Sequence, residues 1–182
     1  MSLLVEKEDL AKLGVKILGI SDFSRLKEAR GVYTLIILVE SMVLLKIGRL
    51  GEKRFERGYY AYTGSASGSG ASSLAGRISR HLRKNKKKRW HIDYLLCSKG
   101  VEIKAFLAMI TEKKMECEIN QCLMSNLKPN VPVVNFGSSD CVRGCRSHLL
   151  YFGFNNYLVN KIAESYLRKR EGEIFVFLEC EI

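Results

Sequence analysis

An aromatic strand, a glycine-serine loop and a strongly basic helix follow one another in residues 58–94, and this succession constrains the fold most. Tyr60 and Tyr62 stand two residues apart, so on a strand their side chains face the same side. Apolar residues at four-residue spacing then predict a helix over about residues 72–86. The apolar faces of strand and helix need each other, so we interpret the loop at 64–73 as part of one domain rather than as a flexible linker.

The same stretch carries most of the positive charge of the chain. Nine basic residues lie from Arg57 to Arg89, and no acidic residue occurs between Arg57 and Asp93, in a chain of net charge +11. Clustered positive charge indicates an anionic partner, DNA or RNA ahead of a membrane surface. A solvated helix end is the alternative interpretation of the run. The residues expected to bind nucleic acid are Ser65, Arg80, Arg83, Lys84, Lys86, Lys87, Lys88 and Arg89.

The chain has the size and composition of a soluble globular protein. Its 182 residues, 47% of them hydrophobic, fit one domain or one domain with extensions. No apolar run reaches the roughly 18 residues of a membrane span, and the N-terminal residues are acidic where a signal peptide is basic. We therefore expect a cytoplasmic protein whose six cysteines are mostly thiols, buried or bound to metal. The sequence gives no indication of an oligomeric state.

Helices and strands are intermingled without a regular alternation, which favours the α+β class. Residues 31–40 and 42–47 are rich in β-branched and aromatic side chains, and we predict that they pair as a hairpin of two buried strands. The other expected helices are 5–13, a short one ending near Arg30, 90–97, one around 115–123 and 155–170; the other expected strands are 15–20, 58–63, 101–110, 133–136, 148–152 and 173–182.

Five separated motifs occur in an order that resembles the GIY-YIG nuclease superfamily. Gly31-Val32-Tyr33 stands for the first tripeptide and Tyr62-Thr63-Gly64 for the second. Arg77 follows, with His81 four residues later, and Glu118 comes on a later helix. The resemblance implies a small central, mostly antiparallel β-sheet flanked by helices. It also implies that Tyr33, Tyr62, Arg77, His81 and Glu118 form the catalytic set.

The phrases GRLG, GYYAYTGSA, RHLR, WHIDYL, ECEI and FGSSDC…SHL narrow the resemblance to one branch. They look like an archaeal domain-of-unknown-function family, number 123, whose members are sometimes fused to DNA-repair endonucleases. The similar region is 31–153, and it leaves an N-terminal extension at 1–30. A C-terminal helix and strand at 154–182 form a second extension, which we expect to pack on the same domain.

The resemblance implies a metal-dependent endonuclease that hydrolyses phosphodiester bonds in DNA repair or processing. Glu118 would hold one Mg²⁺ or Mn²⁺, and Arg77 would fork onto two phosphate oxygens. Tyr33, Tyr62 or His81 would deprotonate the attacking water, and histidine has the more suitable ordinary pKa. Half-buried strand tyrosines, a surface arginine and a solvated glutamate are the structural alternatives. A non-catalytic nucleic-acid-binding module that keeps the fold is one functional alternative, and a metal-binding regulatory or partner-docking protein that uses the loop at 138–148 is another.

The loop at 138–148 contains Cys141, Cys145 and His148, three residue types that bind zinc. Buried thiols, or a loop that faces the substrate, are the alternatives, and Mg²⁺ is the cofactor that we favour. Cys117 and Cys122 stand at helical spacing, and we expect them in the core. Further residues expected near a cleft are His91, Asp93, Ser138, Asp140 and His148.

Overall fold

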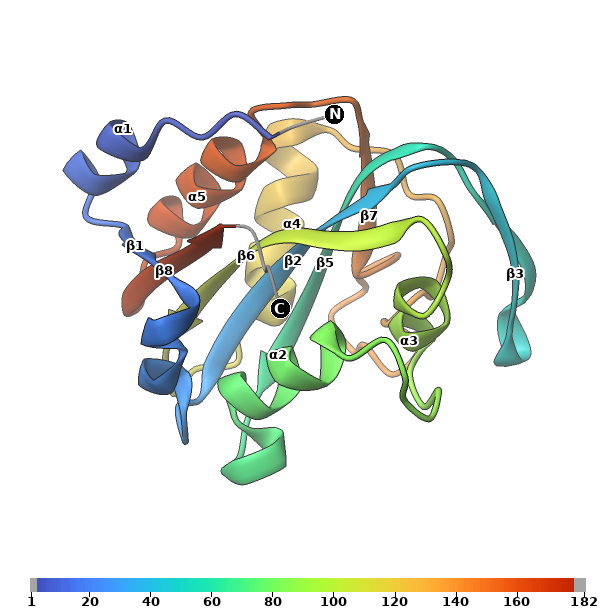
Figure 1. Cartoon of the computed structure of the whole chain (residues 1–182), viewed down its shortest axis with the longest axis horizontal. Coiled ribbons are helices and arrows are strands. Elements are labelled where there is room, and N and C mark those ends of the chain that lie inside the picture. Colours follow the sequence, from blue (N-terminus) through green and yellow to red (C-terminus); the bar gives the residue numbers. More distant parts are fainter. Residues whose placement is uncertain (1–2, 179–182) are drawn as a thin grey trace.

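A six-stranded sheet forms the centre of the protein, in a computed structural model that describes residues 3–178 (Figure 1). Every pair of neighbouring strands is antiparallel except β1 with β8. Helices accompany the sheet, so the predicted α+β class is confirmed. In sheet order the strands are β1 (Lys16–Leu18), β8 (Glu173–Leu178), β6 (Val101–Ile110), β2 (Gly31–Val39), β5 (Gly58–Ala66) and β7 (Leu149–Gly153).

Helices cover both faces of the sheet, which explains why all residues of β2 are buried. Side chains alternate along a strand, so Tyr33, Leu35 and Ile37 pack into one apolar core while Val32 and Ile36 pack into another. The first core receives α2 (Leu74–Leu82) and α3 (His91–Leu96); the second receives α1 (Lys7–Lys12), α4 (Glu116–Leu127) and α5 (Leu158–Arg168). Single 3₁₀ segments lie at Ile20–Leu26, Gly48–Leu50 and Gly70–Ser72.

The predicted pairing of the strands at 31–40 and 42–47 is wrong. The second of them, β3 (Val43–Ile47), pairs with β4 (Gly51–Phe55), a strand that the sequence did not suggest. The two form a separate ribbon at one side of the molecule (Figure 1). The reason is that both edges of β2 are already hydrogen-bonded, to β5 on one side and to β6 on the other. A strand with two neighbours has no edge left for a third.

The described parts of the two predicted extensions join the central sheet. Strand β1, from residues 1–30, pairs in parallel with β8, from residues 154–182. Strand β8 in turn pairs with β6. Residues 179–182, the end of the strand predicted at 173–182, lie outside the described part of the chain, and Cys180 is among them.

Helix α2 is shorter than the predicted helix over 72–86. It begins after Ser73, whose side chain accepts a hydrogen bond from the amide of Gly76, and it ends at Leu82. The amino group of Lys86 then donates to the carbonyls of Arg80 and His81, in the last turn. The carbonyls in the last turn of a helix have no amide donor from the helix itself. Lys86 folds back and donates to two of them, which stabilises the end of α2.

The stretch 133–136, predicted as extended, contains no strand. Asn135 in it adopts a left-handed backbone conformation, with φ of 64°. A strand needs negative φ throughout, so the chain turns here instead. Over the described range, no helix combines the length and the apolar character that crossing a membrane requires.

Candidate functional site

Several segments that are distant in sequence meet at a pocket of about 710 Å³. Its lining residues come from β2 and β5, from α2 and the segment that leads into α3, from the start of α4, and from the loop before β7 (residues 131–148). Three of the five predicted catalytic residues line it: Tyr33, Tyr62 and Arg77. The complete lining is Tyr33, Tyr62, Gly64, Ser65, Arg77, Arg89, Trp90, His91, Lys114, Glu116, Cys117, Gly137, Ser139, Asp140, Cys141, Val142, Arg143 and His148.

Tyr33 and His81 form a buried pair beside this pocket. The Tyr33 hydroxyl lies 2.7 Å from Nε2 of His81, and both residues are about 2% exposed. Burial raises the pKa of Tyr33, and burial with the nearby Lys86 lowers the pKa of His81 to about 3. Both groups are therefore neutral at physiological pH. Nδ1 of His81 is buried and has no hydrogen-bond partner among the described residues.

The lowered pKa of His81 predicts that the folded protein becomes less stable in acid. Between pH 6.5 and about 3 the unfolded chain binds a proton at His81 and the folded chain does not, so folding stability falls as pH falls through this window. The loss from this residue is up to about 1.4 kcal/mol per pH unit. Facing it are Tyr33, Lys86, Arg77, Arg80 and Asp93.

Denaturant unfolding of wild type and His81→Gln at several pH values measures this effect. The variant should lose less stability than wild type on going from pH 6.5 to pH 4. If the stability of the two proteins depended on pH in the same way, burial of His81 would not be the cause of the loss of stability in acid.

The ring of Tyr62 packs against the ring of His81, with centroids 6.0 Å apart. Its ring also packs edge-on against Phe136 at 6.3 Å. Burial raises the pKa of Tyr62 well above its ordinary value, and the Glu116 carboxylate adds to the rise. The hydroxyl is therefore protonated at physiological pH and is not a phenolate.

Arg77 presents a cation to the pocket. Its guanidinium stacks on the ring of Trp90 at 4.9 Å, and Arg80 stacks on the same ring at 4.6 Å. Nε of Arg77 is buried and makes no hydrogen bond within residues 3–178. Arg80, by contrast, donates to the buried carboxylate of Asp93 at 2.6 Å. Arg77 is thus the arginine of this pair that is available to an anion in the pocket.

Glu116, not the predicted Glu118, is the glutamate of α4 that lines the pocket, and Asp140 adds a second carboxylate to the lining. Glu118 does not line the pocket, and it forms a salt bridge with Arg143. The Glu116 carboxylate accepts a hydrogen bond from Ser65 Oγ at 2.8 Å and lies 2.8 Å from Nδ1 of His148. Residues two apart on a helix point about 200° apart, so only one of the two glutamates can face the pocket.

The predicted cleft residues divide into two groups. His91, Asp140 and His148 line the pocket, and His91 Nδ1 accepts the Gly137 amide at 3.1 Å. Asp93 and Ser138 are buried and do not line it. Asp93 instead accepts hydrogen bonds at the start of α3 and from Arg80, so its role is structural.

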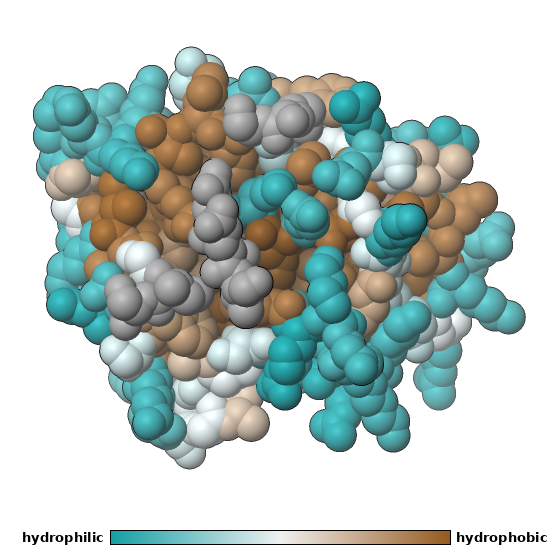
Figure 2. All heavy atoms as spheres, viewed as in Figure 1, coloured by the Kyte–Doolittle hydropathy of each residue, from teal (hydrophilic) through white to brown (hydrophobic). Residues whose placement is uncertain are grey.

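The basic run is only partly free to bind an anion. Lys84 donates to the carbonyls of Leu96 and Val101, and Lys86 is held by the end of α2. Of the predicted nucleic-acid-binding set, Ser65 and Arg89 line the pocket. Hydrophilic side chains gather on the molecular surface near the α2–α3 connection (Figure 2). The basic residues of the set that are exposed are Arg83, Lys84, Lys87, Lys88 and Arg89.

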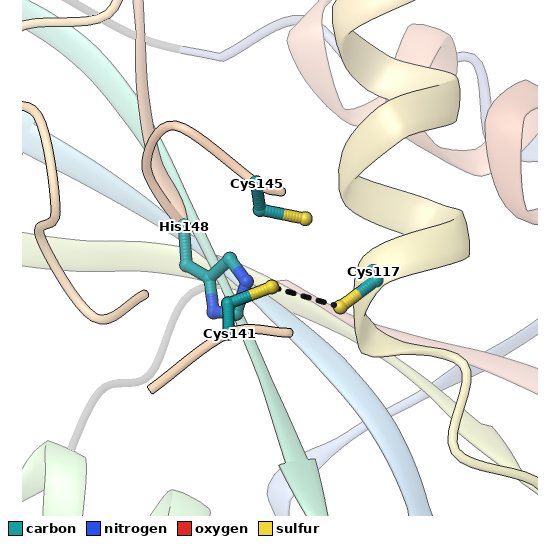
Figure 3. A group of neighbouring side chains, drawn as sticks. All are labelled: Cys117, Cys141, Cys145 and His148. Carbon is teal, nitrogen blue, oxygen red and sulfur yellow. Dashed lines mark hydrogen bonds between the residues drawn. The ribbon is translucent and has the colours of Figure 1, made fainter. Parts of the chain in front are cut away.

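A group of three cysteines and a histidine lies at one wall of the pocket, and it could hold a metal ion (Figure 3). Cys141, Cys145 and His148 come from the loop before β7, as the sequence suggested. Cys117, which we expected in the core, joins them from the start of α4. One ligand atom from each of the four residues lies within 4.8 Å of every other. Cys122, the other cysteine of α4, is buried elsewhere and contacts the carbonyl of Ser165.

A protein-family model described as "Domain of unknown function DUF123" matches residues 32–170, more than half of the chain. No curated protein and no solved structure matches the chain. The family indicated by the sequence motifs is thereby confirmed.

Proposed function

We propose that this chain, which belongs to the DUF123 family, hydrolyses phosphodiester bonds in nucleic acid with the help of one divalent cation. The observation that carries the proposal is the meeting of Tyr33, Tyr62, Arg77 and Glu116 at one pocket, with His81 behind Tyr33. Together they offer a proton acceptor, a phosphate-binding cation and a carboxylate. Phosphodiester hydrolysis assisted by one metal ion uses all three.

A relationship to the GIY-YIG nucleases is part of the proposal. Its support is the arrangement of the two tripeptides on neighbouring strands, where Tyr33 of β2 stands opposite Gly64 of β5. Arg77 and His81 follow on one face of α2, one turn apart. The carboxylate of the set is then Glu116, which opens α4.

Arg77 binds the phosphate in this mechanism. Its guanidinium can donate two parallel hydrogen bonds to two phosphate oxygens, where negative charge develops as the bond breaks. The Trp90 ring supports the plane of the guanidinium from one side. A charged group that is already desolvated and oriented needs little rearrangement during the reaction.

Tyr33 and His81 together take the proton from the attacking water. The Tyr33 oxygen accepts that proton while its own proton passes to Nε2 of His81, 2.7 Å away. Tyr33 ends neutral in this relay, and only His81 gains charge. Burial disfavours an imidazolium, but the anionic phosphate in the pocket favours it. The relay is therefore driven by the arrival of substrate.

Glu116 would hold the cation, for which Mg²⁺ and Mn²⁺ are the candidates. The fit rests on its donor atoms: carboxylate oxygens suit these ions, and the side chain is 26% exposed toward the pocket, so water can complete the coordination. Bound there, the ion would act as a Lewis acid on a phosphoryl oxygen. Ser65 keeps the carboxylate oriented by its hydrogen bond to one oxygen.

The test is cleavage of branched, flapped and single-stranded DNA and RNA with Mg²⁺, with Mn²⁺ and with chelator. We expect cleavage that needs the cation and falls at least about 100-fold in Arg77→Ala, because one oriented charge contributes about 3 kcal/mol or more. Equal cleavage by wild type and Arg77→Ala, or none on all substrates, would contradict the proposal. Salt-sensitive binding that ignores Mg²⁺, without cleavage, would favour the non-catalytic binding module.

Gly64 provides a second test, because a side chain there would displace Tyr33. A Cβ atom at Gly64 would lie 2.5 Å from the Tyr33 hydroxyl and 2.6 Å from Cζ, which is too close. The backbone of Gly64 is not in a conformation that favours glycine, so the clash is the main effect. We expect Gly64→Ala to reduce kcat more than about 10-fold with a folded protein, since a misplaced reacting group is costly. Circular dichroism checks the fold, and unchanged kcat would argue against a role for Tyr33.

A further inference from the structure

We propose that Cys117, Cys141, Cys145 and His148 bind one zinc ion, in a Cys₃His centre separate from the cation at Glu116. The four residues lie on two segments: Cys117 is on α4, and the other three are within eight residues of the loop before β7. The proposal concerns the structure of the loop. It does not require that the protein cleave nucleic acid.

The spacing of the ligand atoms fits a tetrahedral zinc site. Zinc–sulfur bonds of about 2.3 Å at tetrahedral angles place two sulfurs about 3.8 Å apart. The Sγ atoms of Cys117 and Cys141 are 3.5 Å apart, and no pair of the four ligand atoms exceeds 4.8 Å. The site would need shifts of about 1 Å or less to close around the ion. Figure 3 shows the three sulfurs and the imidazole turned toward a common centre.

His148 gives an independent indication of a ligand. It is 4% exposed, and both of its ring nitrogens are buried without a hydrogen bond of good geometry in the described chain. A buried polar nitrogen with no partner is costly, and a zinc ion would satisfy it. Nδ1 of the same ring lies 2.8 Å from a Glu116 oxygen. Zinc-binding histidines commonly direct their second nitrogen to a carboxylate, which fixes the ring and its tautomer.

The ligand types select zinc over the other common ions. Three thiolates and one imidazole are soft and borderline ligands, which favour zinc, whereas Mg²⁺ and Ca²⁺ prefer oxygen. All four positions of the tetrahedron are taken by protein, as in structural zinc sites. The centre therefore serves to hold the chain together rather than to bind substrate.

The loop before β7 is the segment that such a centre would order. It has no helix or strand over residues 131–148, and Val142 on it is 99% exposed. Among its contacts to α4 are hydrogen bonds from Asn120 to the Ser147 carbonyl and from Gln121 to the Arg143 carbonyl. Three zinc bonds from the loop and one from α4 would fix this wall of the pocket. Through His148 the ion would also orient Glu116, and this last consequence rests on the proposed function.

Metal analysis of the full chain, purified without chelator, tests the centre. We expect about one zinc per chain, and replacement by Co²⁺ should give the intense thiolate-to-cobalt absorption of a tetrahedral site. Cys117→Ser and Cys145→Ser should each weaken zinc binding more than about 100-fold, beyond the loss caused by removing an outer partner. The matched controls Cys122→Ser, on the same helix, and Cys97→Ser should keep the full zinc content.

The cobalt spectrum of the wild type keeps the proposal testable if a cysteine variant does not fold. No zinc or cobalt bound after reconstitution under reducing conditions would overturn it. Equal zinc in Cys117→Ser and wild type would overturn it too. Zinc content and cleavage are separate measurements: a zinc-bound protein without cleavage supports this centre and contradicts the proposed activity.

Discussion

Cleavage by Glu116→Gln is expected to fall at least about 10³-fold below wild type, because loss of the carboxylate removes the bound cation. That cation would stabilise the charge of the transition state by several kcal/mol. Glutamine has nearly the same shape and still accepts a hydrogen bond from Ser65, so the fold should persist. The measurement is kcat/KM on the best substrate, over a range of Mg²⁺ concentrations. High Mg²⁺ should rescue part of the loss if the variant binds the ion weakly.

Glu118→Gln is the matched control for this prediction. Glu118 lies two residues further along the same helix, outside the pocket, and it pairs with the half-exposed Arg143. The side chains of Arg143 and Glu118 are 56% and 27% exposed, so we expect loss of this ion pair to cost about 1 kcal/mol and to leave cleavage within severalfold of wild type. A large loss in Glu118→Gln with none in Glu116→Gln would restore the ligand predicted from the sequence and contradict the assignment made from the structure.

Asp93→Ala is expected to destabilise the protein by about 3–5 kcal/mol, because it leaves buried cations without their partner. Asp93 is fully buried and accepts hydrogen bonds from Arg80 and from the amides of Arg89 and Trp90. Its other carboxylate oxygen lies 3.9 Å from the amino group of Lys86, a side chain that is only 4% exposed. Hydrogen bonds to the charged form lower the pKa of Asp93 despite its burial.

Denaturant unfolding at neutral pH measures this effect. Glu102→Ala is the control, because Glu102 forms an exposed ion pair with Lys104 whose loss should change stability by less than about 1 kcal/mol. Similar destabilisation by the two variants would contradict the structural role of Asp93. Loss of Asp93 should also disturb the pocket. Arg80, Lys86 and Asp93 hold the segment between α2 and α3, and this segment carries Trp90, whose ring stacks on Arg77.

Much of the local structure follows from patterns in the sequence. Strand β6 has the bounds predicted for it, 101–110, and helix α3 lies within the segment predicted as a helix, 90–97. Tyr60 and Tyr62 lie in the same core, as their spacing predicts. These elements are correct because side-chain periodicity reports directly which face is buried.

The pairing of strands could not be predicted in the same way. Both edges of β2 that β3 could have used are occupied, by β5 and β6, which begin about 20 and 60 residues after β2 ends. Which partner pairs with β2 depends on the packing of the whole sheet. Strand β4 has three consecutive charged residues, 52–54, and so gives only a weak strand signal.

The site shows the same division between what is local and what is tertiary. The order of Tyr33, Tyr62, Arg77 and His81 is visible in the sequence, and the structure brings these residues together. The choice between Glu116 and Glu118 depends on how α4 is rotated about its axis. That rotation is set by the burial of Ile119 and Leu123 in the second core.

The sequence by itself determined the class of fold, the family, the order of Tyr33, Tyr62, Arg77 and His81, and three of the four residues of the cysteine-histidine group that could hold a metal ion. Only the tertiary structure decided that Cys117 is the fourth, because it is 24 residues from Cys141 in the sequence and the packing of α4 brings their sulfurs to within 3.5 Å. It also decided that Lys84 and Lys86 bind backbone carbonyls. Spacing along a chain fixes which side chains share a face, but contact between distant segments depends on how complete elements pack.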